Sequence, residues 1–171
     1  GWADMLIRLG IRYDSQKALR LGEGVAKFVE AEARKASEEL GKHRGSFPNF
    51  EKSRIKGYSA MRNATVTTIA PTGTISIIAG CSSGIEPLFA VAFIRNVLEG
   101  ERLFEINPTF EALAKAGGFY SGKLLEKIAR SGSVQGVREV PRQAKELFVT
   151  ALEIAPEWHV QMQAAFQKHT D

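Results

Sequence analysis

The stretch RNATVTTIAPTGTISIIAGCSSGIEPLF, residues Arg62 to Phe89, decides which fold this 171-residue chain can adopt. Threonine, valine and isoleucine predict an extended strand over Ala64–Ala70, because β-branched side chains suit a pleated backbone. Pro71 ends that strand. The turn that follows leads into an apolar segment, Thr74–Ala79, which we interpret as a short helix. Its three isoleucines leave a strand open as the alternative. A second turn of small residues comes next.

Leu88–Ile94 is a second apolar run, short enough for a buried strand. Buried strands rich in valine, isoleucine and threonine are typical of parallel α/β sheets and barrels, which need more strands than these two. We therefore expect an α/β fold in which this chain is part of a larger domain, mostly helical with two or more short buried strands. Three successive parts are expected: a helical part (1–57), a strand–turn–helix–strand part (58–95) and a helical part (96–171).

Helices are predicted through most of the remaining chain. A first helix over residues 2–9 stops at Gly10, and Asp14 or Ser15 then caps a long helix. After Arg95 the chain is expected to be helical again, over residues 108–116 behind an Asn107 cap, and over 121–130, 141–152 and 156–169. The apolar residues of the long helix recur every three or four positions and predict one buried stripe. They are Ala18, Leu21, Val25, Phe28, Val29, Ala33, Ala36 and Leu40.

Composition points to one ordinary globular unit, with 44% hydrophobic and 25% charged residues. The net charge of +4 is scattered, so we expect a solvated basic face and no nucleic-acid partner, although local attraction of an anionic substrate stays open. No apolar run approaches the ~20 residues that span a membrane, and the start GWADMLIRLG does not resemble a signal peptide. The single cysteine, Cys81, excludes an internal disulfide and fits a reducing cytoplasm.

The turn after Pro71 has the features of an anion site. If a helix starts near Thr72, the amides of Thr72, Gly73, Thr74 and Ile75 lack intrahelical partners and carry partial positive charge. Such amides, with two threonine hydroxyls, suit a phosphate, and Gly73 lets a ligand approach the backbone. The alternative is a capped turn with no ligand, since no lysine follows the glycine as it would in a Walker motif.

A family resemblance bears on that choice. RNATVTTIAPTGTISIIAG followed by CSSGIEPLFA closely resembles the C-terminal half of the large, catalytic subunit of ribonucleotide reductases. The adenosylcobalamin-dependent (class II) branch fits best, and the similarity extends to GWADMLIRLGIRYDS, RNVLEGERLFEINPTFEAL and PEWHVQMQAAFQKHTD. The resemblance implies a ten-stranded α/β barrel, of which this chain is a partial segment. It also implies reduction of the ribose 2′-carbon by a thiyl radical that the cobalamin cofactor generates.

The resemblance also implies roles for particular residues. The phosphate contacts would be Thr72, Gly73, Thr74 and Ile75, with Ser76 at the edge. Arg62 and Asn63, just before the predicted strand, could hold the loops together or touch substrate. Glu86 could be buried and bonded to backbone amides or to Arg62, an interpretation we favour over acid–base catalysis. Cys81 does not match the radical cysteine and is expected to be a small turn or core residue.

No catalytic or metal-binding residue is expected in this chain. His43, His159 and His169 lie far apart and lack the spacing of metal ligands. One cysteine cannot form the redox pair that the family uses, so the chain is expected to be an internal piece of a reductase, inactive alone. Its partners would be the ribonucleotide substrate and the rest of the reductase chain, with a homo-oligomer left open. Two alternatives also stay open: a non-catalytic helical binding module and a class I large subunit.

Overall fold

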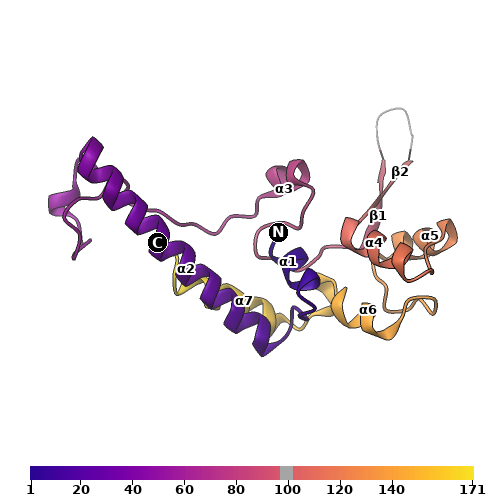
Figure 1. Ribbon diagram of the computed structural model, residues 1–171. Helices are drawn as coiled ribbons and strands as arrows, with labels where there is room; N and C mark the ends of the chain where they lie inside the picture. Colours follow the sequence, from indigo (N-terminus) through magenta and orange to yellow (C-terminus); the bar gives the residue numbers. More distant parts are fainter. Residues whose placement is uncertain (97–101) are drawn as a thin grey trace. The chain divides into compact units, whose positions relative to one another are not determined.

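The computed structural model describes residues 1–96 and 102–171 (Figure 1). The start of the LEGERLFEINP segment lies outside these ranges. The described chain divides into two compact units. The first holds residues 1–18 and 70–160, and the second holds residues 19–69 and 161–171. The three-part division expected from the sequence stays a prediction.

The first unit contains most of the secondary structure. Its elements are α1 (Trp2–Arg8), α3 (Gly73–Ala79), β1 (Ala92–Asn96), β2 (Arg102–Ile106), α4 (Pro108–Ala116), α5 (Gly122–Ser131), α6 (Arg142–Leu147), a 3₁₀ turn (Ala151–Glu153) and the start of α7 (Pro156–Gln167). The expected short helix at Thr74–Ala79 is confirmed as α3. Local signals also placed α4 and α5: the Asn107 side chain accepts hydrogen bonds from the amides of Thr109 and Phe110, and Ser121 accepts one from Leu124.

Strands β1 and β2 form an antiparallel hairpin in which Phe93 pairs with Glu105 and Ile94 with Phe104. Two expectations are corrected here. β1 begins at Ala92, later than Leu88, which instead makes an isolated parallel bridge with Thr150. The residues from Arg102 to Ile106 form a strand, although the chain after Arg95 was expected to be helical. Cross-strand pairing causes this difference, because it satisfies the backbone groups of a segment with weak local preference.

The core of the first unit gathers beside this hairpin. Helix α5 packs on both strands, and α4 contacts α1 (Figure 1). Phe110 and Phe148 are fully buried and meet edge to face, with ring centroids 5.1 Å apart. Leu124 and Ile128 of α5 are buried with them. The hydrophobic contacts of α4 and α5 therefore hold the hairpin in place.

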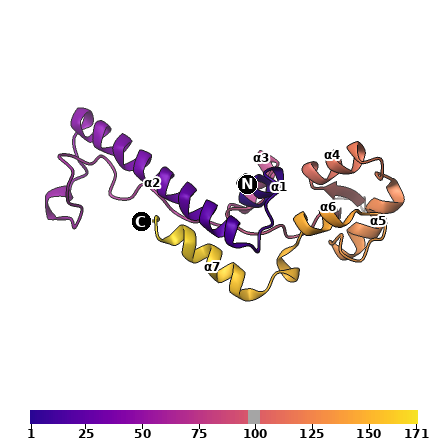
Figure 2. The same ribbon diagram turned by 60° about the horizontal axis from the view of Figure 1, so that its bottom comes forward.

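The second unit is built on helix α2 (Gln16–Arg44), which begins at the end of the first unit. The Ser15 hydroxyl accepts a hydrogen bond from the Ala18 amide, which confirms the expected cap. The end of α7 and the residues after it lie beside α2 (Figures 1 and 2). Two ion pairs join them, Lys168 with Glu23 and Asp171 with Arg34, and His169 Nδ1 makes a hydrogen bond with Glu30.

The expected buried stripe of α2 is wrong in part, since Ala18 is buried but several of the other residues are not. Phe28 is 66% exposed, and Val29 and Leu40 are also exposed. Small residues are buried instead, among them Ala26 and Gly41. A Cβ on Gly41 would lie 2.9 Å from the Met61 amide nitrogen, so the returning chain approaches α2 where side chains are smallest. Within the described residues, the large apolar side chains of α2 are covered only in part.

The expected strand at Ala64–Ala70 is also wrong, because this segment makes no ladder with another described strand. Its amides find other acceptors. Those of Val66 and Thr67 donate to the Asp171 carboxylate at 2.6 and 3.0 Å. A strand requires a neighbouring strand to pair with, and a side chain takes that place here. No helix in the described ranges is long and apolar enough to cross a membrane.

Candidate functional site

The start of helix α3 has a strained backbone. Thr72 is its N-cap, with φ 52° and ψ 31°, the left-handed region that β-branched residues rarely adopt. Among the described residues it is the only non-glycine with positive φ. The amides of Gly73, Thr74 and Ile75 have no acceptor in the described part of the chain. Gly73 and Thr74 are exposed, and Ile75 is 64% exposed, so these three amides are open to solvent or a ligand.

The second turn, Ser82–Gly84, holds this helix start in place. The Gly84 amide donates to Thr72 Oγ1 at 2.7 Å. Ser83 Oγ lies 2.9 Å from Ser76 Oγ, and the Ser76 hydroxyl donates to the Gly73 carbonyl at 3.0 Å. Ser76 is buried and its hydroxyl faces this turn. The hydroxyls of Thr72 and Ser76 are therefore engaged inside the protein.

Gly84 is required at its position. Its φ is +48°, and a Cβ would lie 2.7 Å from the Ala70 carbonyl oxygen, closer than real Cβ contacts come. The backbone entering the helix start and the backbone of the second turn thus touch directly. Any side chain at residue 84 would push them apart.

Asp4 of α1 holds the other side of the second turn. Its Oδ2 accepts from the Ser82 amide at 2.6 Å, and its own amide donates to Ser82 Oγ at 3.2 Å. Its Oδ1 accepts from Asn107 Nδ2 at 2.8 Å. Asp4 is only 8% exposed, so these bonds are shielded from water. We did not predict this role from the sequence; the signal for it was an acidic residue on the apolar face of the first helix.

Of the other residues expected at the site, two belong to the second unit and one, Glu86, belongs to the first. Arg62 and Asn63 belong to the second unit, where the Arg62 amide donates to the Ser37 carbonyl, and the Asn63 amide and side chain contact Ser37 Oγ. Glu86 is exposed, which corrects the expectation that it is buried, because the turn that starts at Ser83 carries it to the surface. Sequence had suggested these three as supports of the phosphate turn, and that role stays a prediction.

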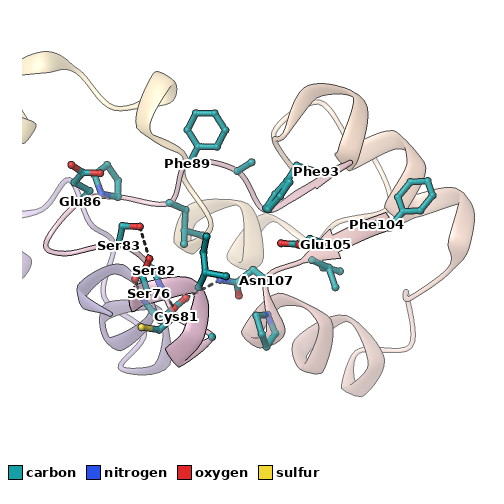
Figure 3. A pocket seen from close by; sticks show the side chains of 18 residues that line it. Ser76, Cys81, Ser82, Ser83, Glu86, Phe89, Phe93, Phe104, Glu105 and Asn107 are labelled. Carbon is teal, nitrogen blue, oxygen red and sulfur yellow. Dashed lines mark hydrogen bonds between the residues drawn. The ribbon is translucent and has the colours of Figure 1, made fainter. Parts of the chain in front are cut away.

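A pocket of about 580 Å³ lies next to the second turn (Figure 3). Ser76 and the second turn line one side, and the hairpin residues Phe93 and Phe104 line another. Glu86, Phe89, Glu105 and Asn107 also belong to its lining and are labelled in Figure 3. None of Thr72, Gly73, Thr74 or Ile75 lines this pocket. The pocket and the open amides of α3 are therefore separate features.

Tyr13 holds the residue that follows the second turn, Ile85. Its hydroxyl donates to the Ile85 carbonyl at 2.8 Å. Burial raises the pKa of Tyr13 above its ordinary value, and the nearby Glu86 carboxylate raises it further. The tyrosine therefore stays neutral and acts as a hydrogen-bond donor.

Cys81 is exposed and sits in the turn that follows α3, where its amide donates to the Ser76 carbonyl at 3.0 Å. It is a turn residue and not a core residue. Over residues 1–96 and 102–171, no three His, Cys, Asp or Glu side chains gather as a metal site would require.

Comparison with known proteins identifies the family. The chain matches the family described as ribonucleotide reductase, barrel domain, over residues 1–60 and 54–171. The chain belongs to this family. It is 52% identical to a vitamin B12-dependent ribonucleoside-diphosphate reductase of Thermoplasma acidophilum, over 100% of this chain and 22% of that protein. A Mycobacterium tuberculosis protein of the same description is 47% identical, over 100% of this chain and 25% of that protein.

A solved structure supports the fold of this ribonucleotide reductase segment. The Actinobacillus ureae class Id ribonucleotide reductase alpha subunit superposes with a TM-score of 0.81 at 29% identity, over 100% of this chain and 30% of that chain. The expected fold is confirmed as a partial segment of the barrel domain, mostly helical with a short two-stranded sheet. The chain spans about a quarter of the length of its B12-dependent relatives.

The comparisons also confirm the branch. Identity falls from 52% with the B12-dependent reductase of Thermoplasma acidophilum to 29% with the ribonucleoside-diphosphate reductase subunit alpha of Chlamydia pneumoniae. The segment is thus more similar to B12-dependent reductases than to that subunit.

Proposed function

We propose that this chain forms the substrate-phosphate corner of a vitamin B12-dependent ribonucleoside-diphosphate reductase. In this proposal the turn Thr72–Ser76 binds the phosphates of the ribonucleotide. The observation that carries the proposal is the set of open amides at Gly73, Thr74 and Ile75. The names of the B12-dependent relatives support the choice of a ribonucleoside diphosphate as substrate.

The chemistry of the turn suits a phosphate. Three amides at a helix start act together as donors, and the partial positive charge of the helix end favours an anion. The exposed Thr74 hydroxyl adds a donor. A Cβ on Gly73 would meet nothing within 4 Å, so the space in front of this residue is open. The Ser76 hydroxyl donates inside the protein, so Ser76 contributes through its backbone and by holding the turn. Thr72 Oγ1 accepts from the Gly84 amide, and its own O–H would remain as a donor to the phosphate.

The supporting residues have different roles in this proposal. Asn63 and the Arg62 backbone anchor the segment that leads toward the turn, through their bonds to Ser37. The exposed Arg62 guanidinium carries a positive charge that would attract an anion. Glu86 carries negative charge and would repel a phosphate. In this proposal it therefore contributes to the shape of the second turn and not to phosphate binding.

The radical chemistry belongs to other parts of such a reductase. Adenosylcobalamin would supply the initiating radical when bound. A corrinoid with its nucleotide tail is larger than the drug-sized ligands that fill cavities of about 300–1,000 Å³. The 580 Å³ pocket next to the second turn is too small to hold such a group. The same proposal includes two further partners, which are the rest of a reductase chain and a second copy of it. It also includes a cytoplasmic location.

A segment exchange tests the proposal. The matching segment of the Thermoplasma acidophilum reductase is replaced by residues 1–171 of this chain, and reduction of a ribonucleoside diphosphate is measured. We expect an active chimera, whose KM for the nucleotide depends on residues 72–75. A chimera that folds and binds cobalamin but does not reduce nucleotides would contradict the proposal.

A further inference from the structure

We propose that Asp4 is a positioning residue for the phosphate turn, acting through the second turn, Ser82–Gly84. This inference rests on the proposed function of residues 72–76. Asp4 contacts neither that turn nor a ligand directly. Its role would be to fix the geometry of the amides that do.

The first step is the bond between Asp4 and Ser82. The two residues exchange hydrogen bonds in both directions, carboxylate to amide and amide to hydroxyl, at 2.6 and 3.2 Å. Asn107 adds a third bond to the same carboxylate, at 2.8 Å. Asn107 is itself fixed, because its side-chain oxygen caps α4 through the amides of Thr109 and Phe110. Asp4 therefore ties Ser82 to two helices.

The second step runs along consecutive residues. Ser82 is bonded to Asp4, Ser83 to Ser76, and Gly84 to Thr72. Three successive residues thus join α1 to both ends of the first turn of α3. Gly84 packs closely against the Ala70 carbonyl, so the second turn cannot move toward residue 70. A shift of Ser82 is therefore passed to Thr72 and to the amides that follow it.

The site needs a carboxylate in particular. Both oxygens of Asp4 face N–H donors, one from the Ser82 backbone and one from Asn107. Asparagine in its place would turn an NH₂ group toward one of these donors. Two donors would then face each other at a position only 8% exposed, where neither can turn to water.

The test uses the reductase chimera described above, with Asp4→Asn and a matched control, Asp14→Asn. Asp14 also lies in the first unit, but its carboxylate pairs with Arg12 and has no bond to the second turn. We expect Asp4→Asn to raise KM for the ribonucleoside diphosphate about tenfold, with kcat changed less than about twofold, since a tenfold change is what one lost charge-assisted bond produces. Inhibition by inorganic phosphate should weaken by the same factor. Asp14→Asn should leave both constants unchanged.

A double-mutant cycle tests whether Asp4 affects the phosphate turn through Ser82–Gly84. If Asp4 acts through the second turn, Asp4→Asn and Ser83→Ala have non-additive effects on KM. If Asp4→Asn does not accumulate as folded protein, Asp4→Glu keeps the charge, moves the oxygens by one methylene and should raise KM in the same way. The proposal would be overturned if Asp4→Asn left KM unchanged or lowered kcat and kcat/KM equally. Additive effects of Asp4→Asn and Ser83→Ala on KM would also overturn it. An unsubstituted chimera without activity would instead contradict the proposed function.

Discussion

The Gly84 amide donates a 2.7 Å hydrogen bond to Thr72 Oγ1, twelve residues earlier in the chain. This bond uses the hydroxyl of the one described non-glycine residue in a left-handed conformation. It therefore gives a structural reason for threonine at a strained position. The hydroxyl that sequence reasoning assigned to a phosphate has an internal partner, and the neighbouring amides remain open.

Two substitutions at Thr72 separate the effect of its hydroxyl on stability from the effect of its branched methyl group. Thr72→Val removes the acceptor of the Gly84 amide and should lower the free energy of unfolding by about 1–2 kcal/mol. Thr72→Ser keeps the acceptor and removes the branched methyl that disfavours positive φ, so its stability should equal or exceed that of the unsubstituted chain. Urea denaturation of the three proteins provides the comparison. A valine variant as stable as the serine variant would show that the bond contributes nothing.

Gly84→Ala should destabilise the first unit. The new Cβ would stand 2.7 Å from the Ala70 carbonyl, and the φ of +48° is unfavourable for alanine. We expect a loss of about 1–3 kcal/mol in the free energy of unfolding. Gly136→Ala is the matched control, because its φ is not positive and its Cβ would meet nothing within 4 Å. Thermal or urea unfolding measures both, and equal stability of the two variants would rule out the close contact.

The Asp171 carboxylate should make the second unit sensitive to acid. Burial opposes its ionisation, but hydrogen bonds from the Val66 and Thr67 amides and the charge of Arg34 outweigh burial and hold its pKa below the ordinary value. A group with a lowered folded pKa stabilises the protein above its unfolded pKa of about 3.9, and this stabilisation is lost as pH falls through the folded pKa.

Asp171→Asn should therefore be less stable than the unsubstituted chain at pH 7, by about 1–2 kcal/mol. The difference should shrink as pH falls below about 4, because the native carboxyl is then protonated as well. Urea denaturation across that pH range measures it. A difference independent of pH would mean that the charge of Asp171 does not hold the Val66–Thr67 backbone.

The exposed apolar side chains of α2 should make the isolated chain associate. Phe28 is 66% exposed and Leu40 is 42% exposed, and burying such large apolar side chains against another surface is favourable. Phe28→Lys with Leu40→Lys should reduce the mean mass in light scattering at matched concentration. Leu152→Lys, in the first unit at a side chain that is 95% exposed, is the control and should change little. Identical masses for all three proteins would contradict the prediction.

Local signals in the sequence predicted most of the helices, although the helix expected over 141–152 ends at Leu147. The Asn107 cap, the Ser121 cap and the Ser15 cap each act within three residues, so a short stretch of sequence contains the whole cause. Strands depend on partners far along the chain. Ile94 pairs with Phe104, and the Val66 amide donates to Asp171. Neither contact can be predicted from the local sequence of one of its two partners.

The candidate site divides in the same way. The open amides after Pro71 follow from the start of a helix and were predicted from the turn sequence. The support from Asp4 through Ser82 joins residues 78 positions apart and gave no local signal beyond an acidic residue on an apolar face. Phe28 was expected in a buried stripe and is 66% exposed, because helical periodicity marks an apolar face without showing what packs against it.

The central claim is that the amides around Gly73 bind the phosphate of a ribonucleotide. In the active chimera, Gly73→Val places a branched side chain in front of these amides, at a position where no neighbour obstructs it. Gly136→Val is the matched control in the same unit. We predict that Gly73→Val raises KM for the ribonucleoside diphosphate at least about tenfold, while Gly136→Val leaves KM unchanged. Equal KM values for the two variants, both folded and active, would contradict the account.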